Sequence, residues 1–131
     1  MKNACSVLKK EECDAVSDTE NVVKELKKRF SLTAAGYISR DGMPKYVEVP
    51  EGTYPETFSI MCATVLGAAS TAAMELGEES PDSLVAETEN LKLYIVPGGM
   101  KGLLVAAKEK GADGEEDAAI IRAMKESMEK I

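Results

Sequence analysis

The sequence predicts an α/β (α+β) domain with one five-stranded antiparallel sheet, a long helix on one face and the terminal helices on the other. Two observations lead to this fold class. Short β-prone segments with a period of two occur twice before residue 50 and three times after residue 83. Apolar residues recur every three or four positions near both ends and in the middle. A chain of 131 residues suits one domain, so we expect a weakly patterned extension over 1–16 and a single domain over 17–131.

The first helix is expected to end near Phe30. Its apolar stripe has helical spacing and consists of Val22, Val23, Leu26 and Phe30. Ser17 or Asp18 is expected to cap its N-terminus, because short polar side chains accept hydrogen bonds from the free backbone N–H groups there.

A β-hairpin is expected next. Asp41-Gly42 lies between two short β-prone runs, and glycine adopts the positive φ of a tight hairpin turn without strain. A three-stranded meander is expected later, with strands over 84–86, 91–96 and 103–107. The closing helix should begin at an acidic turn of Glu115, Glu116 and Asp117, where the positive end of the helix dipole favours carboxylates. Its buried stripe is expected to be Ile120, Met124, Met128 and Ile131.

The long helix, over about 56–78, has an unusual composition, since residues 57–74 carry no charge. Serine, threonine, alanine and Gly67 dilute this run, so membrane insertion is not expected. One broad face should lie on the sheet and contains Phe58, Met61, Cys62, Val65, Leu66, Ala68, Ala69, Ala72 and Leu76. The opposite strip carries small and weakly polar side chains where a solvated helix would carry lysine and glutamate. It consists of Ile60, Ala63, Thr64, Gly67, Thr71 and Met74.

A second copy of the chain is the expected cover for this strip, because a two-fold contact needs only one self-complementary patch. Gly67 would allow close helix crossing, and Thr64 and Thr71 could share hydrogen bonds across the contact. The strip is therefore the predicted dimer and partner interface.

Charge and composition exclude several functions. With 16 basic and 23 acidic residues the formal charge is −7, which disfavours nucleic acid and anionic membranes as partners. The chain contains no histidine, which removes the commonest general base and the commonest zinc ligand together. We therefore expect no catalytic residue, no metal and no cofactor.

Cysteine usage and the N-terminus indicate the compartment. Cys5, Cys13 and Cys62 are an odd, scattered set, which does not resemble a disulfide framework. Charged residues soon after Met1 interrupt any apolar run of a signal peptide. A cytoplasmic location is expected, and Cys62 is expected to be a buried free thiol.

Three motifs partly resemble functional sites, and each also has a structural interpretation. The run from Gly98 to Gly102 lacks the Gly-Lys-Ser/Thr ending of a phosphate loop and precedes a strand, so a hairpin turn is expected. The acidic group Asp113, Glu115, Glu116 and Asp117 lacks the spacing of a calcium loop, which favours a solvated helix start. The basic group Lys24, Lys27, Lys28 and Arg29 is either a solvated helix face or a contact for an acidic partner.

Four segments in this order resemble the Roadblock/dynein light chain family of small dimeric regulators. They are Gly36–Gly42, the alanine-rich helix ending in Glu75-Leu76-Gly77, Leu91–Val96 and Gly102–Ala107. The resemblance implies a Roadblock-like, profilin-like fold in which the long helix pairs with its copy and two sheets join into one. It also implies a non-catalytic platform for a small Ras-like GTPase, or a light-chain-like subunit of a motor complex. No residue carries over as an arginine finger.

Two other functions stay open. Five-stranded sheets with flanking helices also build small-molecule sensors of the PAS and GAF kind, although the many alanines favour tight packing over a lined cavity. An enzyme without histidine is the third possibility, and no pair of acidic residues in the sequence marks its site.

Overall fold

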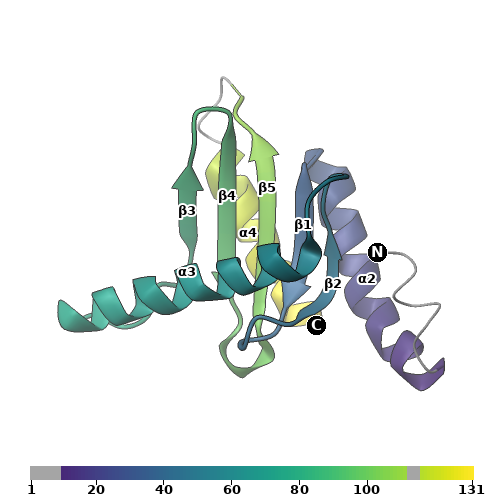
Figure 1. Cartoon of the computed structure of the whole chain (residues 1–131), viewed down its shortest axis with the longest axis horizontal. Coiled ribbons are helices and arrows are strands. Elements are labelled where there is room, and N and C mark those ends of the chain that lie inside the picture. The colour runs from purple at the N-terminus through teal and green to yellow at the C-terminus, as the bar shows by residue number, and fades with distance from the viewer. Residues whose placement is uncertain (1–9, 112–115) are drawn as a thin grey trace.

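The structure is a computed structural model that describes residues 10–111 and 116–131. It consists of helix α2 (Lys10–Phe30), strands β1 (Ala34–Ile38) and β2 (Pro44–Glu48), helix α3 (Pro55–Glu75), strands β3 (Leu84–Glu87) and β4 (Leu91–Pro97), the 3-10 turn η1 (Gly99–Lys101), strand β5 (Leu103–Glu109) and helix α4 (Glu116–Lys130). The five strands form one sheet in the order β2-β1-β5-β4-β3, and all neighbours are antiparallel (Figure 1). This confirms the predicted fold class.

The pairing of β1 with β5 joins the hairpin to the meander. Ala34 lies opposite Ala107 and Ile38 lies opposite Leu103, so two segments about 70 residues apart form the centre of the sheet. The predicted turn between β1 and β2 is confirmed, since Gly42 has a φ of 92° and its N–H donates to the Ser39 carbonyl at 3.0 Å.

One face of the sheet is covered by α2 and α4, as predicted. Val23 on α2 and Met124 on α4 are fully buried against Tyr94 and Leu104 of the sheet. The predicted stripe of the closing helix is confirmed at Ile120, Met124 and Met128, which are buried, while Ile131 is partly buried. This face therefore has a dense core made by the chain alone.

Helix α3 lies across the opposite face. Cys62 and Leu66 pack against a second cluster of buried side chains, namely Ile38, Val47, Ile95, Leu103 and Val105. Only Ser59, Cys62 and Leu66 of its 21 residues are buried. The helix crosses the sheet from the β2 side and its C-terminal part extends beyond β3 (Figure 1). Much of α3 is therefore uncovered in the single chain.

The predicted N-cap of the first helix is wrong. The helix begins at Lys10 and continues through Ser17 and Asp18 without a break. Lysine, glutamate and alanine in its first turns are good helix formers, so the helix does not have to start at a capping side chain. Position 17, the expected start of the domain, therefore lies inside α2.

The predicted sheet-facing side of α3 is wrong in part. Phe58, Cys62, Leu66 and Ala69 are buried or half-buried, as expected. Met61, Val65, Ala68, Ala72 and Leu76 are exposed instead, and Ser59 is buried in their place. A helix with no charge over 18 residues has apolar side chains all round, so its pattern does not determine which side meets the sheet.

Candidate interaction site on helix α3

Local sequence signals define both ends of α3. Pro55 occupies the first turn, where its missing N–H costs no helical hydrogen bond. At the other end Gly77 has a φ of 79°, and its N–H donates to the Met74 carbonyl at 3.0 Å. The Glu78 N–H donates to the Ala73 carbonyl at 2.9 Å, which completes a Schellman end. These signals fix the ends of a helix whose residues 57–74 carry no charge.

The structure brings five of the six predicted site residues together on one exposed side of α3. We call this set the Gly67 strip: Ile60, Thr64, Gly67, Thr71 and Met74. Ile60 is 48% exposed and Met74 is 66% exposed, which is unusual for side chains of this size. The sixth residue, Ala63, is half-buried against the cluster under α3 and lies at the border of the strip.

The two threonines of the Gly67 strip already use their hydroxyl protons within the helix. Thr64 Oγ1 donates to the Ile60 carbonyl at 2.7 Å, and Thr71 Oγ1 donates to the Gly67 carbonyl at 3.1 Å. The expected sharing of these protons across a contact is therefore not available in this arrangement. Satisfied hydroxyls cost less to bury, and the strip is effectively apolar.

Gly67 lies at the middle of the strip with open space around it. A Cβ added there would meet no atom of the chain outside the helix backbone within 4 Å. Glycine inside a helix is less stable than alanine by about 0.5–1 kcal/mol. The packing of the chain itself therefore gives no reason for a glycine at this position.

Sequence reasoning missed a second uncovered surface on the same helix. We call it the Val65 strip: Met61, Val65, Ala68, Ala72 and Leu76. Met61 is 54% exposed, Val65 is 39% exposed and Leu76 is 81% exposed. The signal was present, because these residues also recur three and four apart, offset by one from the Gly67 strip.

Helix α3 is long and apolar enough to cross a membrane by length and composition. The core helix of a folded domain passes the same test, and α3 has Cys62 and Leu66 packed on the sheet. The Cys62 thiol is free and buried, as predicted, and burial raises its pKa to about 11. Cys5 lies outside the described residues, as does the side chain of Cys13.

The motifs considered for other chemistry have structural roles. Gly98 and Gly102 form the turn between β4 and β5, where the Gly98 N–H donates to the Gly102 carbonyl at 2.7 Å. This confirms the hairpin-turn interpretation. The Tyr37 hydroxyl donates to the Lys101 carbonyl in the same turn. Asp113 and Glu115 lie outside the described residues, and Glu116 and Asp117 begin α4.

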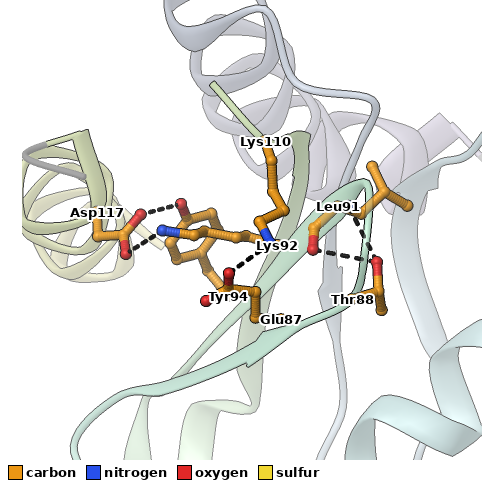
Figure 2. A network of polar contacts seen from close by, with 7 residues as sticks. All are labelled: Glu87, Thr88, Leu91, Lys92, Tyr94, Lys110 and Asp117. Carbon is orange, nitrogen blue, oxygen red and sulfur yellow. Dashed lines mark hydrogen bonds and ion pairs between the residues drawn. The ribbon is translucent and has the colours of Figure 1, made fainter. Parts of the chain in front are cut away.

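Asp117 joins α4 to the sheet in a polar network (Figure 2). The Tyr94 hydroxyl donates to Asp117 Oδ1 at 2.5 Å, and Lys92 Nζ donates to Asp117 Oδ2 at 2.8 Å. Lys92 first and Tyr94 second hold the pKa of Asp117 below its usual value. Burial and the Asp117 carboxylate raise the pKa of the Tyr94 phenol. This network is a clasp between α4 and β4, and all its polar groups are paired.

The basic residues at the end of α2 contact different partners within the chain. Lys24 pairs with Glu20 at 2.6 Å, and Lys27 pairs with Glu48 at 3.2 Å. Arg29 lies over the Phe30 ring at 5.0 Å from its centroid. These contacts favour a structural role for three of the four residues.

The hollow between the two terminal helices is smaller than a typical ligand pocket. The hollow between α2 and α4, bordered by Leu26 and Ala123, has a volume of about 90 Å³. Small-molecule sites usually measure about 300–1,000 Å³ and are mostly apolar. Two wider, open depressions of about 460 and 550 Å³ lie beside α4, and the larger is lined by Ala118, Ile121, Arg122, Lys125, Glu126 and Glu129.

A largely uncovered apolar helix on a small α+β domain is typical of protein-interaction domains. The comparison with protein families identifies which one: the chain belongs to the Roadblock/LC7 domain family, whose model matches residues 18–108. This confirms the resemblance seen in the sequence. The family is in general regulatory and non-catalytic.

Solved structures share this fold. MglB from Myxococcus xanthus matches with a TM-score of 0.77 and 14% identity, over 88% of this chain and 85% of that chain. A Roadblock/LC7 domain from Streptomyces avermitilis matches with a TM-score of 0.74 and 18% identity, over 84% and 91%. A structure described as MglB with a tetrameric arrangement matches with a TM-score of 0.70 and 21% identity, over 86% and 91%. No curated protein sequence matches the chain.

Proposed function

We propose that the chain is a non-catalytic homodimeric interaction module that binds and regulates a small Ras-like GTPase in the cytoplasm, or serves as a light-chain-like scaffold subunit. Membership of the Roadblock/LC7 family supports this class of function. The tetrameric arrangement described for one structural neighbour supports self-association. Free, buried Cys62 agrees with a reducing compartment.

One observation carries the homodimer, namely the exposed Gly67 strip. Ile60 and Met74 lie uncovered at its ends, and Gly67 leaves its middle free of any side chain. A second α3 crossing at Gly67 would bury the two end residues and approach the glycine backbone closely. Burial is worth about 25 cal/mol per Å², so a standard interface of roughly 1,600 Å² is ample for a dimer.

A small-molecule sensor of the PAS or GAF kind is not favoured. Such a sensor needs a lined cavity against the sheet, but Tyr94, Leu104 and Met124 fill the space under α2 and α4. On the other face, Cys62 and Leu66 pack directly on the strands.

Gly67→Glu tests the proposed dimer. The substitution would bring two like charges together in a dry contact, at a cost of several kcal/mol, so we expect the variant to be monomeric or aggregated. Sedimentation or light scattering measures the mass at micromolar concentration. A wild-type mass near 14.0 kDa would refute the dimer, and a variant that stays dimeric would place the contact on another surface.

The regulatory role needs a separate assay. Purified Ras-like GTPases of the same cell are incubated with the wild-type dimer and with Gly67→Glu, and both binding and the rate of GTP hydrolysis are measured. We expect binding to be lost along with dimerisation. The chain alone should not hydrolyse GTP. Steady hydrolysis by the pure protein that a point mutation in it abolishes would contradict the non-catalytic assignment.

A further inference from the structure

Helix α3 packs on the sheet only along its first part, residues 55–66. All of its buried side chains lie there, namely Ser59, Cys62 and Leu66. Phe58 and Ala63, which are partly buried against the same cluster, also lie there. In residues 67–75 each residue is exposed or half-buried, and none belongs to either hydrophobic cluster. We call residues 55–66 the anchored part of α3 and residues 67–75 its projecting part.

The projecting part extends past the edge of the sheet. It lies beyond β3, which is the last strand on that side (Figure 1). Residues 74–80, which include the end of the helix and the turn after it, are all exposed. A helix in a protein owes most of its stability to the packing of one face, and no side chain on any face of the projecting part is buried in the single chain. The projecting part therefore depends on its own backbone hydrogen bonds.

The residues of the projecting part add only a little stability of their own. It begins with Gly67, the poorest helix former apart from proline, and it also contains a serine and a threonine. Its last turn has Glu75 and no basic residue, although the negative end of the helix dipole favours a cation there. Four alanines and the Schellman end at Gly77 still favour the helix. The projecting part is therefore folded on average, but it costs little to open.

We propose that the projecting part of α3 opens by local unfolding in the single chain and closes when two copies assemble, while the anchored part unfolds only with the sheet. Opening of the projecting part exposes neither hydrophobic cluster, whereas opening of the anchored part would expose Cys62 and Leu66. Closure on assembly rests on the proposed homodimer, because the Gly67 strip includes Thr71 and Met74 of the projecting part. The opened segment presents backbone to proteases and other backbone-binding partners, so it distinguishes a single chain from an assembled one.

Hydrogen exchange of the full chain compares the two parts. The amides of residues 62–66 donate within the anchored part and those of residues 71–75 within the projecting part, since each helical N–H bonds to the carbonyl four residues earlier. Thr64→Lys supplies the monomer, because it places two like charges in the proposed contact from an exposed position outside the projecting part. In this variant we expect amides 71–75 to exchange at least about a hundredfold faster than amides 62–66, after correction for intrinsic rates.

Assembly should reduce this contrast. In the concentrated wild type we expect amides 71–75 to exchange at least about tenfold more slowly than in Thr64→Lys, with little change at amides 62–66. Sedimentation of the same samples establishes which of them are dimeric. Ile60→Lys, also in the anchored part, is the second monomeric variant if Thr64→Lys does not fold by circular dichroism or stays dimeric.

A charge change at the helix end tests the cause of the opening. Glu75→Lys, added to Thr64→Lys, replaces an unfavourable charge at the negative end of the helix dipole, so it should slow amides 71–75 by about two- to fivefold. Glu126→Lys makes the same charge change at an exposed position of α4 and should alter their exchange by less than about twofold.

Two results would overturn the inference. Exchange of amides 62–66 and 71–75 at rates within about threefold in the monomer would show that α3 opens as one unit. Fast exchange of amides 71–75 in a wild type that sediments as a dimer would show that assembly does not close the projecting part. A monomeric wild type would refute the proposed homodimer and closure with it, whereas the contrast within one chain would still decide whether the projecting part opens by itself.

Discussion

The two faces of the sheet are built in different ways. Under α2 and α4, fourteen buried residues form one cluster, and four of them come from the 15 residues of α4. Under α3, seven residues form the cluster, and the helix contributes only Cys62 and Leu66. The first face has a complete hydrophobic core. On the second face the flanks of α3 remain exposed in the single chain. Under the proposed function, stability and interaction belong to opposite faces of one sheet.

The largest expected effect separates a core methionine from an exposed one. Met124→Ala removes a side chain with no exposed area on the α4 face and should lower the free energy of unfolding by about 2–5 kcal/mol. Met74→Ala removes the same side chain at a 66% exposed position and should change the stability of the diluted chain by less than about 0.5 kcal/mol. Urea unfolding at low protein concentration measures both.

For self-association we expect the opposite: Met74→Ala should have the larger effect and Met124→Ala the smaller. Met74→Ala should weaken the proposed dimer, because Met74 ends the Gly67 strip, and Met124→Ala should leave it intact wherever the protein is folded. Sedimentation at several concentrations makes this comparison. Equal destabilisation of the diluted chain by both substitutions would show that α3 is already covered within one chain.

The strands and the α2–α4 face could be predicted from the sequence because polar and apolar residues alternate clearly there. Asp41-Gly42 marks the hairpin, and Ile120, Met124 and Met128 mark the buried side of α4. The rotation of α3 could not be predicted, since charge is the usual marker of a solvated side and residues 57–74 carry none. The Gly67 strip was identified by its small residues. The Val65 strip was hidden because it looked like core.

A smaller effect concerns the clasp that ties α4 to β4. Tyr94→Phe removes the hydroxyl that donates to Asp117 and should cost about 1.5–3 kcal/mol, as for hydrogen bonds to charged groups. The clasp should also depend on pH. The pKa of Asp117 is lower in the folded protein than its usual 3.8, so its contribution is full well above pH 3.8 and is lost as the pH falls through the folded value.

Thermal unfolding of the wild type, Tyr94→Phe and Asp117→Asn between neutral and acidic pH measures this clasp. The advantage of the wild type over Asp117→Asn should shrink as the pH falls. Lys110→Ala, which removes the ion pair with Glu87 directly after the neighbouring strand β5, is the matched control. A constant advantage of the wild type at every pH would show that Asp117 does not act through its charge.

The smallest expected effect is the most informative, because one substitution should raise the stability of the chain and weaken its self-association. Gly67→Ala should raise the stability of the diluted chain by about 0.5–1 kcal/mol, since alanine is the better helix former and the added Cβ meets nothing within 4 Å. The same methyl group would stand between two backbones that approach closely in the proposed dimer, so self-association should weaken. Ala68→Gly, one position along the helix and off the strip, should lower stability by a similar amount without weakening the dimer. Chemical unfolding of the diluted chain measures the change in stability, and sedimentation of the concentrated protein measures the change in self-association. If Gly67→Ala stabilised both the chain and the dimer, the glycine would not be the point of closest approach, and the crossing would have to lie elsewhere on α3.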